Sequence, residues 1–471
     1  MRPGGDMCFQ GGTMYYRLHP AAALRGWQNA AAMLVKRPGN ETRPLTPAQF
    51  AALMLCDGET PLCLSALGAE EQAALQQFVE SGLITMHETP LPIDEDQRYC
   101  FFENRFIQRV MWSVTGACNY RCRHCFVDGP EKACHSLSTG EAIEIIDQLA
   151  ACGVMQVELT GGEPLVRPDF WRLVDRLAER KIHIAQIYTN GALADEAFYA
   201  AMAKRGMKPA LCFSFDGVNG WHDWMRGVPG AEETTLRAME LGIRYGHDVY
   251  AGMCLHKGNL PSLRETVKHL AQMGVRGLNI SGITMSPLWQ QNNGGYHLDD
   301  REYLDAAMAY FARYVQDGQP MRVMFNGAAL LQKDESRVIF SECRQENTRQ
   351  YLCGTARFAP YISEEGRLLP CMPMTMCQEQ KLFPLVLEKG LAACLGDGFF
   401  MEVVSRCRED LFKHNTKCGS CESRHSCGGG CRANALRENH DFLGSDAYQC
   451  LIWREGYREK LLAALEAAYK Q

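Results

Sequence analysis

Short apolar runs alternate with amphipathic stretches over residues 105–318. The runs are VMWSV (110–114), VMQVEL (154–159), IAQIY (184–188), ALCFSF (210–215), VYAGMCL (249–255) and VRGLNI (275–280). Each run is followed by a stretch with helical spacing of apolar residues, as in residues 139–153. Buried parallel strands joined by single helices curl towards a barrel. The pattern therefore predicts an α/β fold, a partial (β/α)6 TIM-like barrel.

Residues with useful chemistry follow the predicted strands directly. Cys118 follows the first strand, GGEP (161–164) the second, TNG (189–191) the third, and Ser214 with Asp216 ends the fourth. In a barrel of this kind the carboxyl ends of the strands meet at one face, where the active site lies. We therefore expect these residues to share one site.

The segments outside the barrel have other patterns. Residues 14–90 contain strand-like MYYRL, AAMLVK and LITMH and two helical stretches, the first capped by Thr46 and ended by Asp57-Gly58. This order predicts a small winged-helix-like domain, preceded by a glycine-rich flexible tail at 1–13. Residues 340–471 lack apolar periodicity until a closing helix around 451–470, and their cysteines and glycines indicate a domain stabilised by metal.

Composition excludes several classes of protein. A chain of 471 residues predicts more than one domain, and 46% hydrophobic with 22% charged residues is ordinary for a globular protein. No apolar run reaches the length of a membrane span, and the N-terminus has no signal-peptide pattern, so we expect a soluble, cytoplasmic protein without a membrane partner. A net charge of −6 without basic blocks argues against nucleic acid.

The 22 cysteines are unusually many for a protein without export signals, and ten of them fall into two patterns. The first pattern is C-x3-C-x2-C, formed by Cys118, Cys122 and Cys125. Three thiolates leave one iron of a four-iron cubane without a protein ligand, so that iron can bind a substrate or cofactor. A zinc site would need a fourth ligand, and His124 is awkwardly placed to supply it.

This three-cysteine motif, together with GGEP (161–164), YTNG (188–191) and SFDG (214–217), resembles the radical S-adenosylmethionine (SAM) superfamily. The resemblance implies that the three cysteines hold a catalytic [4Fe–4S] cluster. It also implies reductive cleavage of SAM to methionine and a 5′-deoxyadenosyl radical, which removes a hydrogen atom from the substrate. The SAM contacts it implies are Gly161, Gly162, Glu163, Pro164, Thr189, Asn190, Ser214, Asp216 and Arg226. Two alternatives stay open: Asn190, Ser214 and Asp216 could only form turns, and Arg226 could be a surface residue.

The second cysteine pattern is C-x12-G-x4-C, then C-x2-C-x5-C-x3-C, then a last cysteine. It resembles the SPASM extension of radical SAM enzymes, which implies two auxiliary [4Fe–4S] clusters and three clusters in all. The implied ligands are Cys353, Cys371 and Cys431 for the first, and Cys418, Cys421, Cys427 and Cys450 for the second. Cys343 is the nearest candidate for a fourth ligand of the first cluster, which is otherwise open. Cys377, Cys394 and Cys407 are interpreted as structural, and a zinc ribbon is the alternative for 418–431.

SPASM enzymes mostly act on peptides, and residues 14–90 resemble the recognition element that adds a leader peptide as a strand. The expected function is a peptide maturase that forms a thioether in a precursor peptide with a leader sequence, with flavodoxin or ferredoxin as electron donor. Alternatives are carbon–carbon crosslinking, epimerisation, a small-molecule SPASM enzyme in which residues 14–90 are a lid, and a non-enzymatic electron carrier. Anaerobic sulfatase maturation is disfavoured because Met372, and not an acid, follows Cys371.

Overall fold

The computed structural model describes residues 14–125, 136–340, 348–396 and 398–470, so the predicted tail at 1–13 and Cys343 lie outside the described residues. The chain divides into two compact units. One contains the residues up to Gln108 with Leu149–Gln156, and the other contains Arg109–Gln148 with Val157–Gln471. Among the described helices, none is both long and apolar enough to cross a membrane.

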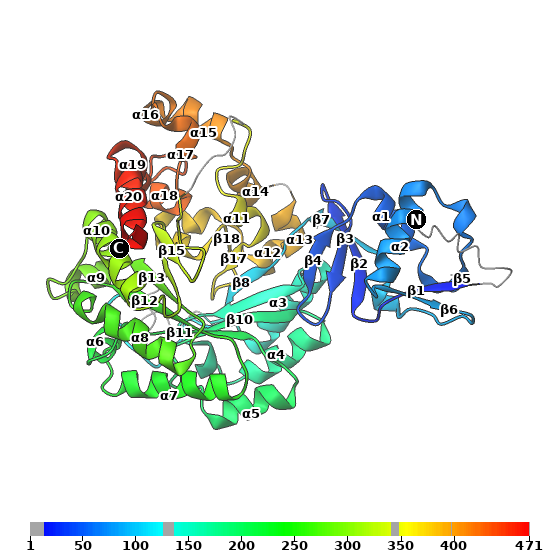
Figure 1. Cartoon of the computed structure of the whole chain (residues 1–471), viewed down its shortest axis with the longest axis horizontal. Coiled ribbons are helices and arrows are strands. Elements are labelled where there is room, and N and C mark those ends of the chain that lie inside the picture. Colours follow the sequence, from blue (N-terminus) through cyan, green and yellow to red (C-terminus); the bar gives the residue numbers. More distant parts are fainter. Residues whose placement is uncertain (1–13, 126–135, 341–347, 397, 471) are drawn as a thin grey trace. The chain divides into compact units, whose positions relative to one another are not determined.

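An 11-stranded sheet forms the centre of the larger unit (Figure 1). The six predicted strands are present and lie side by side in chain order: β8 (Val110–Ser113), β9 (Gln156–Thr160), β10 (His183–Thr189), β11 (Ala210–Ser214), β12 (Val249–Leu255) and β13 (Gly277–Gly282). A seventh parallel strand, β14 (Arg322–Phe325), continues the series beside β13. The predicted α/β fold with a parallel, barrel-like sheet is confirmed.

Short strands extend both ends of this sheet. Beyond β14 lie the antiparallel β15 (Ala329–Leu331) and β16 (Arg337–Val338). Beyond β8 lie β17 (Tyr361–Ile362), which is parallel to β8, and then β18 (Leu368–Leu369). Because β16 and β18 are the two ends of the order, the sheet is an open, partial barrel.

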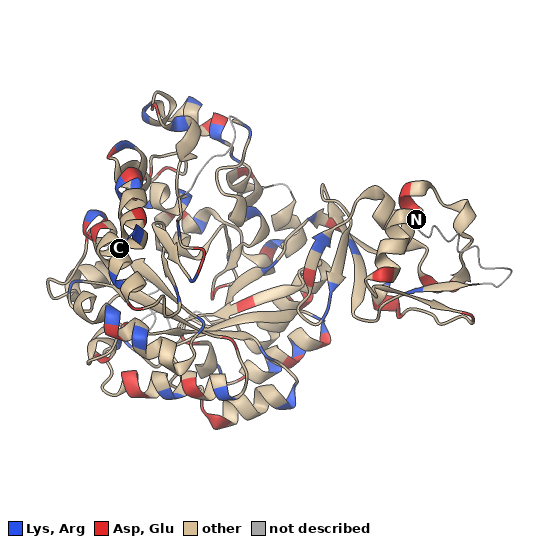
Figure 2. Ribbon diagram, viewed as in Figure 1, with Lys and Arg blue, Asp and Glu red and all other residues tan. Residues whose placement is uncertain are grey.

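Helices cover the outside of the sheet. They are α3 (Thr139–Ala151), α4 (Phe170–Glu179), α5 (Glu196–Lys204), α6 (Trp221–Arg226), α7 (Ala231–Arg244), α8 (Leu263–Met273), α9 (Pro287–Asn292) and α10 (Asp300–Gln316), with 3-10 turns η3 (Pro164–Val166) and η4 (Leu260–Ser262). Acidic and basic residues are mixed along α4, α5 and α7 (Figure 2). Ion pairs such as Arg205–Asp175, at 2.6 Å, join neighbouring helices. Each such partly exposed pair contributes about 0–1 kcal/mol.

The chain after β16 forms short helices around β17 and β18. These are α11 (Gly354–Phe358), η5 (Met372–Met376), η6 (Gln378–Leu382), α12 (Val386–Lys389), α13 (Leu391–Leu395), α14 (Phe399–Val404), α15 (Arg408–His414), α16 (Thr416–Gly419), α17 (Arg424–Cys427), α18 (Arg432–Asn439), α19 (Ala447–Arg454) and α20 (Tyr457–Lys470). The closing helix expected around 451–470 is present as α20, but the first part of that stretch belongs to a separate helix, α19. Gly456, at φ +76°, takes the left-handed conformation between α19 and α20 and so breaks the helix in two.

The smaller unit contains two sheets with helices beside them. Its strands are β1 (Tyr15–Leu18), β2 (Ala22–Gln28), β3 (Met33–Lys36), β4 (Glu41–Pro44), β5 (Asp57–Pro61), β6 (Ile84–His87) and β7 (Cys100–Arg105), in the orders β5-β1-β6 and β4-β3-β2-β7. Its helices are α1 (Pro47–Met54), α2 (Ala69–Glu80) and the turns η1 (Leu64–Ala66) and η2 (Glu95–Gln97).

The sequence predicted the start of helix α1 correctly but not its end. The Thr46 hydroxyl accepts the Gln49 amide, which confirms the predicted start of α1. The predicted end at Asp57-Gly58 is wrong, because α1 stops at Met54 and Asp57 begins β5. The Asp57 carboxylate accepts the amides of Glu59 and Thr60 at 2.8 and 2.7 Å, so it shapes the strand that pairs with β1.

Candidate active site

The loop after β8 carries the three-cysteine motif. The Tyr120 amide donates to the Cys118 sulfur at 3.4 Å, and the Cys125 amide donates to the Cys122 carbonyl at 3.2 Å. Burial raises the pKa of the Cys118 thiol to about 12, and the thiolates of Cys122 and Cys125 add to this rise. The three sulfur atoms are therefore near enough to repel one another as thiolates, and a cationic iron site would relieve that repulsion.

The end of α6 holds this loop in place. The Arg123 amide donates to the Met225 carbonyl at 2.8 Å, and its guanidinium donates to the Trp224 carbonyl at 2.9 Å while lying 4.7 Å from the Trp224 ring centre. A Cβ on Gly227, which has φ +69°, would lie 2.9 Å from the Arg121 carbonyl oxygen. The cysteine loop and the loop after β11 are thus packed as one structure.

The glycines of GGEP lie against the backbone just before the cysteines. The Gly162 amide donates to the Thr115 carbonyl at 2.8 Å, and the Glu163 amide donates to the Ala117 carbonyl at 2.9 Å. A Cβ on Gly161 would lie 2.5 Å from the Thr115 oxygen, and one on Gly162 would lie 2.4 Å from the Ala117 oxygen. Glycine is therefore required here by the chain's own backbone, a reason for the motif that the sequence did not reveal.

Substitution of Gly162 by alanine should displace the cysteine loop. Overpacking of this kind costs about 1–3 kcal/mol, and each 1.4 kcal/mol corresponds to a factor of about ten in affinity. We expect the Gly162→Ala enzyme, reconstituted with iron and sulfide, to bind SAM at least about tenfold more weakly in equilibrium dialysis. Gly140→Ala is the matched control, because a Cβ there meets nothing within 4 Å. Unchanged affinity in the Gly162 variant would show that the loop tolerates the shift.

Glu163 ties the second and third motifs together. Its fully buried carboxylate accepts the Thr189 hydroxyl at 2.9 Å, the Asn190 amide at 2.7 Å and the Leu165 amide at 3.1 Å. Burial raises the Glu163 pKa to about 7, while these hydrogen bonds act in the opposite direction. The Asn190 side chain in turn donates to the Asn119 side chain at 2.8 Å, inside the cysteine loop. Glu163 therefore binds the Thr189 side chain and the Asn190 backbone, and the Asn190 side chain connects this group to the cysteine loop.

Asp216 and Arg226 form a buried ion pair beside the cysteine loop. Their closest atoms, Oδ2 and Nη2, are 2.6 Å apart, and the Arg226 Nη1 also donates to the Cys122 sulfur at 3.6 Å. The Asp216 Oδ1 accepts the Cys254 amide at 3.0 Å. Burial opposes ionisation of Asp216, but the Arg226 guanidinium holds its pKa well below the usual range. Arg226 is thus no surface residue, and its charge is already matched by Asp216. Ser214, the last residue of β11, lies at the same end of the sheet.

His124 faces Asp216 and Cys254. In the described part of the chain, these three residues form the one group of three potential metal ligands whose ligand atoms all lie within 4.8 Å of one another. A tetrahedral zinc ion, with bonds of about 2.3 Å, needs sulfur atoms about 3.8 Å apart. No three described cysteines are that close, so both zinc alternatives fit poorly. The Arg226 guanidinium also disfavours a second cation at the His124 group.

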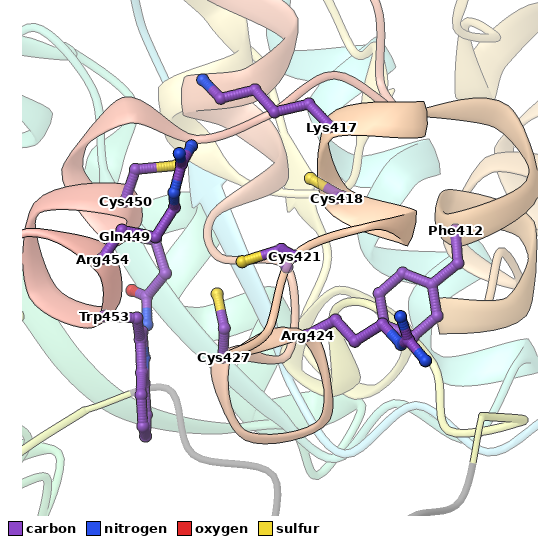
Figure 3. A pocket seen from close by; sticks show the side chains of 11 residues that line it. Phe412, Lys417, Cys418, Cys421, Arg424, Cys427, Gln449, Cys450, Trp453 and Arg454 are labelled. Carbon is purple, nitrogen blue, oxygen red and sulfur yellow. The ribbon is translucent and has the colours of Figure 1, made fainter.

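Four cysteines of the second pattern surround one pocket. The sulfur atoms of Cys418, Cys421 and Cys427, on and between α16 and α17, face the same space as that of Cys450 on α19 (Figure 3). Burial raises the pKa of Cys427 to about 12, and the thiolates of the other three add to the rise. Four converging thiols spaced more widely than a zinc site fit a cubane cluster.

The buried Arg432 shapes the glycine loop beside this pocket. Its guanidinium donates to the carbonyls of Gly429, Phe442 and Gly444, the last two at 2.9 Å. A Cβ on Gly429 would lie 2.5 Å from the Leu411 side chain, and one on Gly430 would lie 2.5 Å from the Asp446 carboxylate. The loop therefore has to be glycine for the chain to pack closely around the four thiols.

The remaining three cysteines of the pattern also converge. Burial raises the pKa of the Cys371 thiol, and the thiolates of Cys431 and Cys353 raise it further. Cys371 and Cys353 lie just before η5 and α11, and Cys431 lies just before α18. The structure thus brings together the sets 353/371/431 and 418/421/427/450 that the SPASM resemblance implies. Cys343 lies outside the described residues.

A cavity of about 530 Å³ opens where the ends of β13 and β14 approach the cysteine-rich segment. Its walls include Ser281, Tyr303 and Asn326 from the barrel, and Cys431, Asn434 and Glu438 from the segment around α18. Asp300, at the start of α10, also lines it, and no hydrogen bond or ion pair of its carboxylate is seen among the described residues. Burial raises the Asp300 pKa, and the nearby Asp446 adds to this rise. No sequence pattern indicated Asp300 as a site residue.

Comparison with known proteins identifies the larger unit. Residues 112–270 match the radical SAM superfamily. The chain is a radical SAM enzyme. Such an enzyme binds SAM and a [4Fe–4S] cluster, and the three adjacent thiols of the first loop are a donor set that suits the cluster.

Individual relatives of this radical SAM enzyme have different functions. The AdoMet-dependent heme synthase of Methanosarcina barkeri is 24% identical over 74% of this chain and 97% of that protein. The PqqA peptide cyclase of Granulibacter bethesdensis is 27% identical over 69% of this chain and 83% of that protein. The structure of Streptococcus suis SuiB bound to the precursor peptide SuiA matches with a TM-score of 0.63 and 15% identity, over 92% of this chain and 99% of SuiB. That match shows a shared fold.

Proposed function

We propose that this radical SAM enzyme is a SPASM peptide maturase that crosslinks a ribosomally made precursor peptide, forming a thioether between a cysteine sulfur and a carbon. The cavity carries this proposal, because it joins the carboxyl ends of the barrel strands to Cys431 of the first auxiliary set. A substrate residue in the cavity would lie between the radical source and a second redox centre. The similarity to a peptide cyclase, and a fold shared with a maturase solved with its precursor peptide, support a peptide as the substrate.

The site residues have separate roles in this proposal. Cys118, Cys122 and Cys125 hold the catalytic cluster, which when bound supplies the electron that cleaves SAM. The loops of GGEP, TNG and SFDG would hold SAM, with Gly161, Gly162, Pro164, Asn190 and Ser214 as its contacts. Glu163, Thr189, Asp216 and Arg226 are positioning residues, because their polar groups bind the neighbouring loops. A flavodoxin or ferredoxin supplies the electrons.

The smaller unit takes the leader peptide in this proposal. Both of its sheets end in strands that are paired on one side only among the described residues, for example β4 and β6. Such an edge accepts a further strand through main-chain hydrogen bonds, whatever the sequence of that strand. The lid alternative predicts no binding of a leader peptide by this unit.

Thioether formation needs an outlet for one proton and one electron. The 5′-deoxyadenosyl radical takes a hydrogen atom from the carbon, and the carbon–sulfur bond forms as the thiol loses its proton and one electron leaves. Asp300 is the proton acceptor in this proposal, since it lines the cavity and its pKa is raised above its ordinary value. An iron–sulfur cluster held by Cys353, Cys371 and Cys431 would supply the electron acceptor.

A small-molecule reaction is the second candidate, and the match to nearly the full length of a heme synthase favours it. The two functions are separated by incubating the enzyme with neighbouring precursor peptides, with and without their leaders. A peptide maturase modifies one of them and needs its leader. A small-molecule enzyme leaves every peptide unchanged.

A further inference from the structure

We propose that Cys377 is the fourth thiolate ligand of the first auxiliary cluster and completes the set of Cys353, Cys371 and Cys431. This inference rests on the proposed function, since it needs an auxiliary cluster at that set. It replaces two expectations from the sequence: that Cys377 is structural, and that Cys343 is the nearest candidate for the fourth ligand.

One short helical segment connects Cys371 to Cys377. The turn η5 begins directly after Cys371 and ends directly before Cys377. The Met374 amide donates to the Cys371 carbonyl at 3.2 Å, and the Cys377 amide donates to the Met374 carbonyl at 3.1 Å. Two successive 3-10 turns therefore place the two cysteines at opposite ends of a compact segment.

The same segment packs against the helix that follows Cys431. Turn η5 contacts α18, and Cys431 is the residue just before α18. The Cys377 sulfur lies 4.0 Å from the carbonyl oxygen of Ala433, two residues beyond Cys431. Cys377 is therefore directed towards the start of α18, where the ligand set converges. It is only 4% exposed, so it does not face bulk water.

The surroundings of Cys377 differ from those of an ordinary buried cysteine. Glu379, Arg437 and the Cys431 thiol all lie near Cys377, and Cys377 in turn lies near the Cys371 thiol. Cys394 is similarly buried, at 3% exposure. Among the described residues, Lys389 is the only charged group that shifts its pKa, and no other cysteine does so. Cys394 therefore provides a matched control in the same part of the chain.

A fourth thiolate changes what the first auxiliary cluster can do. With all four irons held by cysteine the cluster accepts an electron but has no open iron for a substrate. A peptide thiol would then attack the carbon radical directly, within the cavity beside Cys431, without first binding iron. The specificity for the reacting thiol would come from the cavity walls.

The test uses the full chain with Cys118, Cys122 and Cys125 replaced by alanine, so that only auxiliary clusters remain. After anaerobic reconstitution this parent should hold about eight irons. Cys377→Ala, Cys343→Ala and Cys394→Ala are each added to it, and iron content and electron paramagnetic resonance are measured before and after oxidation by ferricyanide. We expect Cys377→Ala to lose about one iron per chain on oxidation and to give a [3Fe–4S] signal, because an iron without a thiolate is released most easily.

The outcomes separate this inference from the proposed function. The parent, Cys343→Ala and Cys394→Ala should keep their iron and stay without the signal. The inference is overturned if the parent already gives the signal, if Cys343→Ala gives it, or if Cys377→Ala behaves like Cys394→Ala. A parent with no more than about four irons would instead mean that one auxiliary cluster is absent, which would contradict the proposed function. Cys377→Ser, which keeps the size of the side chain, repeats the measurement should the alanine variant not fold.

Discussion

Replacement of Cys118, Cys122 and Cys125 together by alanine abolishes SAM cleavage. The three thiols share one loop after β8, and Cys122 and Cys125 lie near enough to Cys118 to raise its pKa, so the three form one donor set. Without it the catalytic cluster has no protein ligand, and no electron reaches SAM. The measurement is 5′-deoxyadenosine formed after reduction with dithionite, and we expect none above the rate without enzyme.

Cys212→Ala is the control for this experiment. Cys212 is a buried cysteine on β11, outside both patterns, and its replacement should leave the formation of 5′-deoxyadenosine within about twofold of the unaltered enzyme. The assignment of the SAM cluster fails if the triple variant retains measurable cleavage. Retained cleavage would not contradict the two auxiliary sets, because their iron content is measured in a separate experiment.

The second large effect is expected from Asp300→Asn. If Asp300 accepts the proton of the reacting group, the amide removes the acceptor and keeps the size of the side chain. General-base removal of this kind costs about 100-fold or more in rate. The crosslinked peptide should therefore form at least about 100-fold more slowly, while SAM is still cleaved to 5′-deoxyadenosine without product. The readout is the ratio of crosslinked peptide to 5′-deoxyadenosine.

Asp305→Asn tests whether any loss is specific to the cavity. Asp305 is exposed on the same helix, α10, and does not line the cavity. It should retain the ratio of the unaltered enzyme. An unchanged ratio in the Asp300 variant would exclude Asp300 as the proton acceptor. Equal loss of SAM cleavage and product would instead indicate damage to the barrel.

The barrel strands were predictable because each reads as a nearly continuous apolar run. The runs at 110–114, 184–188 and 249–255 match β8, β10 and β12 within a residue or two. The strands that extend the sheet gave no comparable signal. Strands β17 and β18 have two residues each, and they exist because Tyr361 and Ile362 pair with β8, far away in sequence. Pairing of that kind leaves no local pattern.

The candidate site was predictable in its position but only partly in its contacts. The sequence predicted that the motifs follow the carboxyl ends of neighbouring strands, and the parallel sheet confirms that these ends lie at one face. It did not show that Glu163 binds Thr189 and Asn190, or that Arg226 pairs with Asp216. The partners of Glu163 lie 26 and 27 positions away, and Arg226 lies 10 positions from Asp216, so neither helical nor strand spacing indicates these contacts. The motif residues therefore hold one another's loops in position. Their sequence motifs indicated contacts with SAM and did not predict this role.

The cavity and Cys377 show a second limit of sequence reasoning. Asp300 reads as an ordinary acidic residue in the first turn of a helix, and only the approach of α18 and α19 to the barrel makes it a cavity residue. Cys377 falls outside the spacing of the seven-cysteine pattern. It lies near Cys431 because η5 packs against α18. Both features depend on tertiary contacts alone.

The measurement that tests the central claim most directly is mass spectrometry of precursor peptides after anaerobic coexpression. The peptides are short, cysteine-containing ones encoded beside this enzyme. The account predicts that one of them loses the mass of two hydrogen atoms, that its cysteine no longer reacts with iodoacetamide, and that deletion of its leader prevents the change. The same mass loss with a reactive cysteine would indicate a carbon–carbon crosslink, and an unchanged mass with a shifted retention time would indicate epimerisation. No change in any peptide, in cells where the enzyme carries its full iron and cleaves SAM, would contradict a peptide maturase.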